Sequence, residues 1–156
     1  ADHEIPYRRF DHAPVFTCEE TEREISAEAE GVQTKNLFLR DKRGKRHWLV
    51  VTSCEKSPDL RALAPHIGAD HLSLASAERL ERHLGVTPGS VTVLALINDG
   101  AHAVELWVDH DVWHASAWRC HPMVNSATLV IARSEIDRFL AATGHEARVV
   151  RVPERR

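Results

Sequence analysis

The sequence has few cysteines and no long apolar run. Cys18, Cys54 and Cys120 are odd in number and far apart, and no C-x-x-C pair is present. We therefore expect free thiols in a reducing, cytoplasmic compartment. No apolar stretch approaches the roughly 20 residues that a membrane helix needs, and the start shows no secretory signal pattern. These absences predict a cytoplasmic protein without a membrane partner.

Common catalytic motifs are also missing. The chain contains no G-x-S-x-G, no phosphate-binding loop and no Rossmann glycine pattern. No cysteine lies in a local sequence that would activate a thiolate. His110 and His114 are four positions apart, but no third ligand is evident, and H-x-x-x-H alone is a weak metal signal. We predict neither a metal ion nor a cofactor.

The charge is nearly balanced, at a formal net value of -3. That value argues against a protein whose whole surface is coated by nucleic acid, although it allows a local basic patch. One such patch is dense, with four positive charges in five positions, at Lys42, Arg43, Lys45 and Arg46. The patch is either a solvated turn or a contact for nucleic-acid phosphates.

Hydrophobic patterning predicts more strands than helices. The stretch TKNLFLRDKRGKRHWLVV, residues 34–51, is typical of a β-hairpin with turn residues at its centre. Asn98-Asp99-Gly100 indicates a second hairpin, joining strands at 93–97 and 104–108. Further strands are expected at 5–10, 72–74, 127–132 and 147–152. We predict one domain over residues 1–156, in the α+β class, with a mixed, largely antiparallel sheet and helices packed outside it.

Four helices are expected from their capping signals. Thr17 with Glu20 precedes a helix at 19–29, and Ser57 with Pro58 begins one that ends near residue 68. Ser76 and Gly85 bracket a helix with Leu80 and Leu84 on one side. The fourth begins at Ser134, with Asp137, and ends before Gly144.

Three short segments combine residue types that suit a binding site. Lys35 and Asn36 are polar residues at the start of an apolar strand. Residues 87–90 form a glycine turn, which can present backbone N–H groups to an oxyanion or simply join a helix to a strand. Residues 121–128, HPMVNSAT, place a histidine, a proline and an amide before a strand, either for binding or as an ordinary turn.

Taken together, these segments resemble the prolyl-tRNA-synthetase-associated editing family, the YbaK/ProX-like aminoacyl-tRNA deacylases. The resemblance is carried, in family order, by TKNLFLRD, LASAERLERHLGVTPGSVTVLALIND, HPMVNSAT and FLAATGHE. It covers most of the chain from Gly31 onward. The sequence is most similar to the freestanding alanyl-tRNA(Pro) deacylases of that family.

The resemblance implies specific site residues. The essential lysine of the family falls on Lys35. The implied substrate-binding positions are Asn36, Gly89, Ser90, His121, Pro122, Asn125 and Thr128. The family loop commonly reads G-x-x-x-P, whereas this chain has Val93 at the last position. Without the proline the loop is less rigid, and the preferred amino acid depends on that loop.

The implied activity is hydrolysis of a mischarged small amino acid, most simply alanine, from tRNA(Pro). In the family picture water attacks the ester, the ribose hydroxyl of the substrate assists, and no metal takes part. The implied partners are mischarged tRNA and, transiently, prolyl-tRNA synthetase. Two alternatives stay open: a deacylase for serine, threonine or cysteine, and a non-catalytic tRNA-binding module.

Overall fold

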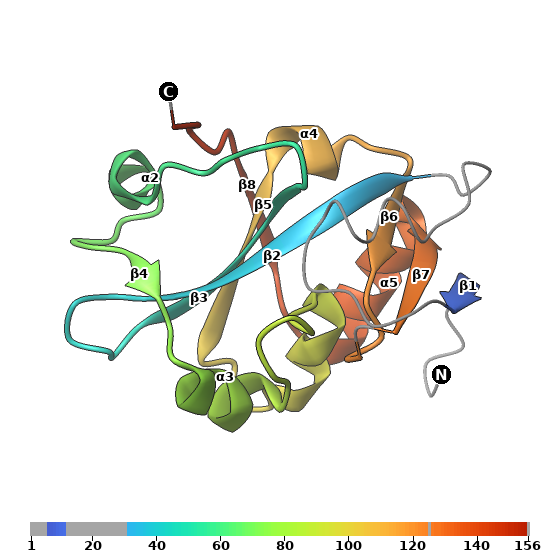
Figure 1. Cartoon of the computed structure of the whole chain (residues 1–156), viewed down its shortest axis with the longest axis horizontal. Coiled ribbons are helices and arrows are strands. Elements are labelled where there is room, and N and C mark those ends of the chain that lie inside the picture. Colours follow the sequence, from blue (N-terminus) through green and yellow to red (C-terminus); the bar gives the residue numbers. More distant parts are fainter. Residues whose placement is uncertain (1–5, 12–30, 125, 156) are drawn as a thin grey trace.

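The computed structural model describes residues 6–11, 31–124 and 126–155. Its centre is an eight-stranded sheet in the order β1-β7-β6-β2-β3-β5-β8, with β4 also paired to β2 (Figure 1). The strands are β1 (Arg8–Asp11), β2 (Val32–Arg40), β3 (His47–Ser53), β4 (Ser73–Leu74), β5 (Val104–Asp109), β6 (Ala117–Cys120), β7 (Ala127–Ala132) and β8 (Ala147–Val150). The helices are α2 (Leu60–His66), α3 (Ala77–Leu84), η1 (Val93–Asn98, a 3₁₀ helix), α4 (His110–Trp113) and α5 (Arg133–Thr143).

The predicted α+β class and mixed sheet are confirmed. Within the described residues, four strand pairs are antiparallel, namely β1–β7, β2–β3, β2–β4 and β6–β7. The pairs β2–β6, β3–β5 and β5–β8 are parallel. None of the described helices is long and apolar enough to cross a membrane.

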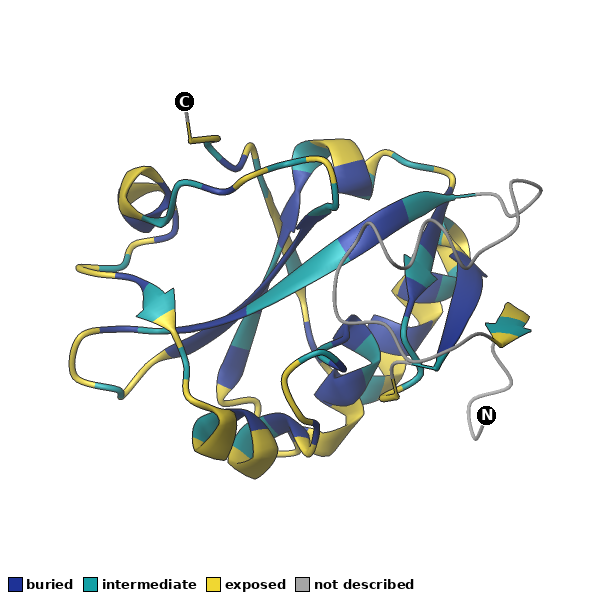
Figure 2. Ribbon diagram, viewed as in Figure 1, coloured by how far each residue is buried: buried dark blue, intermediate teal, exposed yellow. Residues whose placement is uncertain are grey.

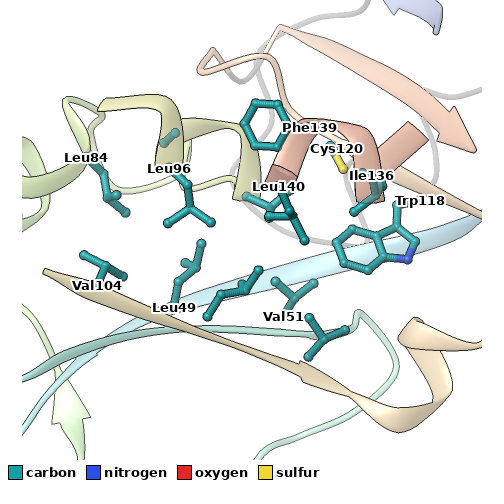
Figure 3. Close-up of a cluster of buried hydrophobic side chains, with 14 of the residues drawn as sticks. Leu49, Val51, Leu84, Leu96, Val104, Trp118, Cys120, Ile136, Phe139 and Leu140 are labelled. Atoms are coloured by element: carbon teal, nitrogen blue, oxygen red, sulfur yellow. The ribbon is translucent and has the colours of Figure 1, made fainter. Parts of the chain in front are cut away.

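The larger core lies on one face of the sheet, under α3, η1 and α5. Leu49 and Val51 of β3 meet Leu96 of η1 and Leu140 of α5 in this cluster (Figure 3). The helices show exposed outer surfaces and buried inner ones (Figure 2), as amphipathic helices on a sheet do. We call this side of the sheet the core face.

The opposite face has a smaller core at one end. There Leu63 of α2 and Ile67, which follows the helix, cover Leu39 of β2 and Trp48 and Val50 of β3. Because side chains alternate along a strand, odd-numbered β2 residues share this face with Leu39, while even-numbered ones share the core face with Phe38.

The hairpin of β2 and β3 was predicted correctly, and its tip is held from two sides. Oδ1 of Asp41 accepts hydrogen bonds from the backbone N–H groups of Lys45 (2.8 Å) and Arg46 (3.2 Å). Arg79 of α3 donates to the Gly44 carbonyl (3.0 Å) and lies 3.2 Å from Nε2 of His47. Burial lowers the pKa of His47 to about 4, so its neutral ring accepts the Arg79 hydrogen bond at pH 7. The basic tip is therefore a fixed part of the fold.

The second predicted hairpin is wrong. Residues 93–98 form η1 rather than a strand, and the Thr92 hydroxyl caps it by accepting from the Leu94 N–H at 3.3 Å. β5 pairs in parallel with β3 and β8 instead. The carboxylate of Asp99, expected to be a hairpin turn residue, accepts from the N–H groups of Ala103 and Val104 and contacts His145. It therefore holds a wider loop that leads into β5.

The capping signals had mixed outcomes. Ser76 and Gly85 bracket α3 as predicted. Asp59, not Ser57, caps α2, and no side chain caps α5, so the predicted role of Ser134 is wrong. The helix predicted at 19–29 lies outside the described residues. Two short elements, α4 and β6, were not predicted.

Candidate active site at the edge of β2

The candidate site centres on a stretch of β2 that no described strand flanks on one edge. Along the edge opposite β3, β6 pairs with Val32 and Gln33, and β4 pairs with Leu39 and Arg40. Among the described strands, none pairs with residues 34–37 on that edge. We call these four residues the edge window. Unpaired strand edges present backbone donors and acceptors to whatever binds there.

Lys35 lies in the edge window and is partly exposed. It is paired across β2–β3 with Thr52, which is fully buried. Alternation places its side chain on the same face as Leu37 and Leu39, away from the larger core. The ammonium is thus carried by a rigid central strand, which fixes its position better than a loop would.

Asn36, its sequence neighbour, points to the other face. It is paired with Val51 of the larger core. Its Oδ1 is buried and has no hydrogen-bond partner among the described residues. The two predicted residues therefore lie on opposite faces of β2.

The predicted histidine and threonine lie on the neighbouring strands. His121 directly follows β6, and its Nδ1 is 3.1 Å from the Ala127 carbonyl oxygen. Thr128 lies on β7, fully buried, and is paired with Phe10 of β1. The β2–β6 pairing ends at Gln33 and Arg119, two residues before Lys35 and His121, and the β6–β7 pairing ends at Cys120 and Leu129, next to His121 and Thr128.

The loop between β6 and β7 carries the predicted Pro122, and Asn125 lies outside the described residues. In this loop Met123 has a φ of 66°, a left-handed conformation that is uncommon for a side chain of its kind. Its sulfur lies 3.7 Å from Nδ2 of Asn98, at the end of η1. This contact ties the loop to the element that follows the glycine turn.

The glycine turn approaches from the core face. Gly89 has a φ of 88°, which favours glycine, and the N–H of the buried Ser90 donates to the Thr87 carbonyl at 3.0 Å. Val93, the residue that replaces the family proline, begins η1 and is buried in the larger core. Packing therefore anchors the end of this loop where the family uses a proline ring.

Cysteine chemistry does not fit the described part of the site. Burial raises the pKa of Cys120 to about 12, so its thiol is protonated at neutral pH. Cys54 is disulfide-bonded, which corrects the prediction of three free thiols. Neither residue can supply a thiolate nucleophile.

A histidine pair on α4 was the only metal signal in the sequence. The rings of His110 and His114 lie 4.4 Å apart, as the four-residue spacing predicts. Among the described residues, no group of three histidine, cysteine, aspartate or glutamate side chains is placed to hold a metal ion. The histidine pair therefore remains a ring contact at the end of β5.

The basic hairpin tip divides into two kinds of residue. Lys42, Arg43 and Lys45 are exposed. Arg46 is engaged in the fold: its guanidinium lies 2.9 Å from the Glu105 carboxylate and 4.7 Å from the centre of the Trp48 ring. Three of the four predicted contacts are thus available to a ligand without breaking an interaction.

The fold and this lysine-bearing edge can be compared with known proteins. The aminoacyl-tRNA editing domain family matches residues 12–139. The prolyl-tRNA editing protein ProX of Acetoanaerobium sticklandii is 36% identical over 146 residues, covering 94% of this chain and 88% of ProX. Prolyl-tRNA synthetase associated domain-containing protein 1 of Danio rerio is 39% identical over 137 residues, covering 86% of this chain and 73% of that protein.

Solved structures agree on the fold. A structure provisionally assigned as a trans-editing enzyme for prolyl-tRNA synthetase superposes with a TM-score of 0.71 at 19% identity, covering 96% of this chain and 87% of its own. The hypothetical protein APE2540 superposes with a TM-score of 0.74 at 21% identity, covering 97% and 93%.

These similarities place the chain in a class of enzymes, the aminoacyl-tRNA deacylases, as predicted from the sequence. The chain belongs to the aminoacyl-tRNA editing domain family. The sequence resemblance to that family is therefore confirmed.

Proposed function

We propose that this protein is a trans-editing hydrolase that removes alanine from mischarged tRNA(Pro). The observation that carries the proposal is the position of Lys35, a cation on a rigid strand beside an edge that none of the described strands pairs with. The similarity to ProX, a prolyl-tRNA editing protein, supports tRNA(Pro) as the substrate and a transient association with prolyl-tRNA synthetase.

The proposed chemistry is hydrolysis of the ester between the amino acid and the terminal ribose. Attack on the ester carbonyl produces a tetrahedral oxyanion, which an ammonium and backbone N–H groups stabilise. Lys35 supplies the ammonium, and the edge window offers the adjacent backbone groups. The same ammonium could instead bind the terminal phosphate, and the experiment that separates these roles is given in the Discussion.

Water is the proposed nucleophile, assisted by the ribose hydroxyl of the substrate. This fits the thiols described above, since Cys120 is buried and protonated. His121 directly follows β6, the strand that pairs with β2 just before Lys35, and its Nδ1 lies 3.1 Å from the Ala127 carbonyl oxygen. That contact fixes the orientation of the imidazole ring beside the site.

Alanine is the proposed amino acid for a steric reason. A synthetase that accepts proline cannot strongly reject the smaller alanine, because each missing methylene is worth only about 1–3 kcal/mol of discrimination. A second site that admits a methyl group and excludes the proline ring supplies the remaining selectivity. A deacylase for serine, threonine or cysteine is the competing assignment.

A substrate panel tests the proposal. We expect alanyl-tRNA(Pro) to be hydrolysed at least tenfold faster than seryl-, threonyl-, cysteinyl- or prolyl-tRNA(Pro), measured in single-turnover reactions with matched concentrations. The control is the uncatalysed hydrolysis of each ester. Faster hydrolysis of another ester would change the assignment of the substrate, and no hydrolysis of any ester would leave a non-catalytic tRNA-binding module.

The exposed part of the hairpin tip is proposed to contact tRNA phosphates. Lys42 follows Lys35 of β2 by seven residues, which corresponds to about 23 Å of extended chain. Lys42 would therefore contact a part of the tRNA different from the terminal ester.

Reversing the charges of Lys42, Arg43 and Lys45 to glutamate should weaken tRNA binding and lower the slope of log K against log salt. The slope should fall by up to about 0.9 for each phosphate that the variant no longer neutralises. The amino-acid preference should not change. The matched control reverses Arg138, Arg151 and Arg155, which are also exposed. Equal slopes for the two triple variants would mean that the tip is merely solvated.

A further inference from the structure

One buried polar side chain lies on the same strand as Lys35. Gln33 lies on β2, two residues before Lys35, and only 8% of its surface is exposed. Its side-chain Oε1 is buried and has no hydrogen-bond partner among the described residues. Leaving a buried amide oxygen unpaired destabilises the folded state, so such a group calls for an explanation, and a role in binding or catalysis is one.

The main chain around Gln33 is firmly held. Its carbonyl oxygen accepts a hydrogen bond from the Cys54 N–H at 2.9 Å, and the residue is paired with Arg119 on β6. Thr34, the next residue, donates from its hydroxyl to the Arg119 carbonyl at 2.6 Å. Side-chain alternation then puts Gln33 and Lys35 next to each other on one face of β2. The Gln33 side chain, just outside the edge window, and the Lys35 side chain, within it, thus lie at the end of the window nearest β6.

The two groups suit different parts of an aminoacyl ester. Lys35 is a donor and a cation, so it attracts a phosphate or the developing oxyanion and repels another cation. Oε1 of Gln33 is a neutral acceptor and needs an N–H or O–H donor. The α-ammonium group is such a donor, attached to the carbon next to the ester carbonyl, and charged donors form the stronger hydrogen bonds.

We propose that Gln33 accepts a hydrogen bond from the α-ammonium group of the aminoacyl ester, and that this hydrogen bond orients the ester carbonyl toward Lys35. The inference rests on the proposed deacylase function and adds a substrate requirement to it, a free amine. An acylated amine, as in peptidyl-tRNA, carries no ammonium and could not form this charged hydrogen bond. Gln33 is thus a positioning residue that separates aminoacyl-tRNA from peptidyl-tRNA.

The test combines two variants with two esters. Gln33→Met keeps the length of the side chain and removes the acceptor, whereas Gln33→Glu keeps an acceptor. Alanyl-tRNA(Pro) carries the ammonium, and propionyl-tRNA(Pro) carries the same methyl and ester without an amine. Each single-turnover rate is divided by the uncatalysed hydrolysis rate of the same ester. The ratio of the two normalised rates, alanyl to propionyl, is then compared between variants, because this ratio does not depend on the fraction of the protein that is folded.

We expect Gln33→Met to lower alanyl-tRNA hydrolysis about tenfold and to leave propionyl-tRNA hydrolysis within twofold of the parent; tenfold corresponds to about 1.4 kcal/mol. Gln33→Glu should keep the preference for the alanyl ester. Gln33→Met should also melt at or above the parent temperature, because it removes a buried oxygen that has no hydrogen-bond partner in the described part of the chain.

Three outcomes would overturn the inference. Equal reductions on both esters would indicate a packing role, unchanged rates on both would indicate no role, and disappearance of the preference in Gln33→Glu would indicate that the side-chain N–H₂ group faces the substrate. A parent protein that hydrolyses neither ester would refute the proposed deacylase function instead, so the two failures are distinguishable.

Discussion

Replacing Lys35 with alanine should lower single-turnover hydrolysis of alanyl-tRNA(Pro) by about 10²–10³-fold, the range seen when one oxyanion-stabilising donor is removed. The folded state should be unaffected, because Lys35 is partly exposed and its truncation leaves no buried cavity. Thermal melting of the variant should therefore match that of the parent. Near-parental hydrolysis would remove Lys35 from the site.

The dependence on protein concentration separates the two roles of this lysine. If Lys35 stabilises the oxyanion, the maximal rate falls and excess protein does not restore it. If Lys35 binds the terminal phosphate, affinity falls and excess protein restores much of the rate. Lys45→Ala, which removes the same charge from an exposed position at the hairpin tip, is the matched control. It should keep the maximal rate within about threefold.

The second large effect concerns a different lysine, and it falls on stability. Nζ of Lys56 lies 2.9 Å from Oδ2 of Asp109, with side-chain exposures of 13% and 1%. Nζ also donates to the Val152 carbonyl at 3.0 Å, and Oδ1 of Asp109 accepts from the Val152 N–H at 2.9 Å. The ion pair therefore fastens the turn after β3 and the end of β5 to the chain that follows β8.

Lys56→Met should lower the free energy of unfolding by about 3–5 kcal/mol, because it leaves a carboxylate buried without its counter-ion. Urea titration measures the decrease. The double variant Lys56→Met, Asp109→Leu should recover most of it, because no charge is then left unpaired. Hydrolysis per folded molecule should stay near the parental value. A decrease below about 1 kcal/mol in the single variant would show that water solvates Asp109 well enough.

Local signals predicted the elements that local interactions decide. The Ser76 hydroxyl accepts from the Arg79 N–H, and Gly85 adopts a φ of 68°, so both ends of α3 could be predicted from the sequence. The segment 93–98 was predicted wrongly because long-range packing, rather than local interactions, decides its structure. Its valine and leucine content favours a strand, yet packing of Val93 and Leu96 into the larger core selects a 3₁₀ helix.

Long-range pairing decided what the sequence could not show. β6 has only four residues, and its place beside β2 depends on a parallel pairing that no local pattern encodes. The same holds for the site. Lys35 was found through its motif, whereas Gln33 became notable only because the fold buries its amide oxygen without a partner among the described residues. Nothing in the sequence around Gln33 indicates that burial.

The sheet order has a consequence for how the protein is made. Gln33 of β2 pairs with Arg119, and Phe10 of β1 pairs with Thr128, so neighbouring strands come from distant parts of the chain. The β2–β3 hairpin can close as soon as it is synthesised, but these pairings must wait for β6 and β7. During synthesis the part of the β2 edge that β6 covers, at Val32 and Gln33, therefore stays unpaired until most of the chain has left the ribosome. A nascent chain that stops before β6 would carry the lysine but not the site.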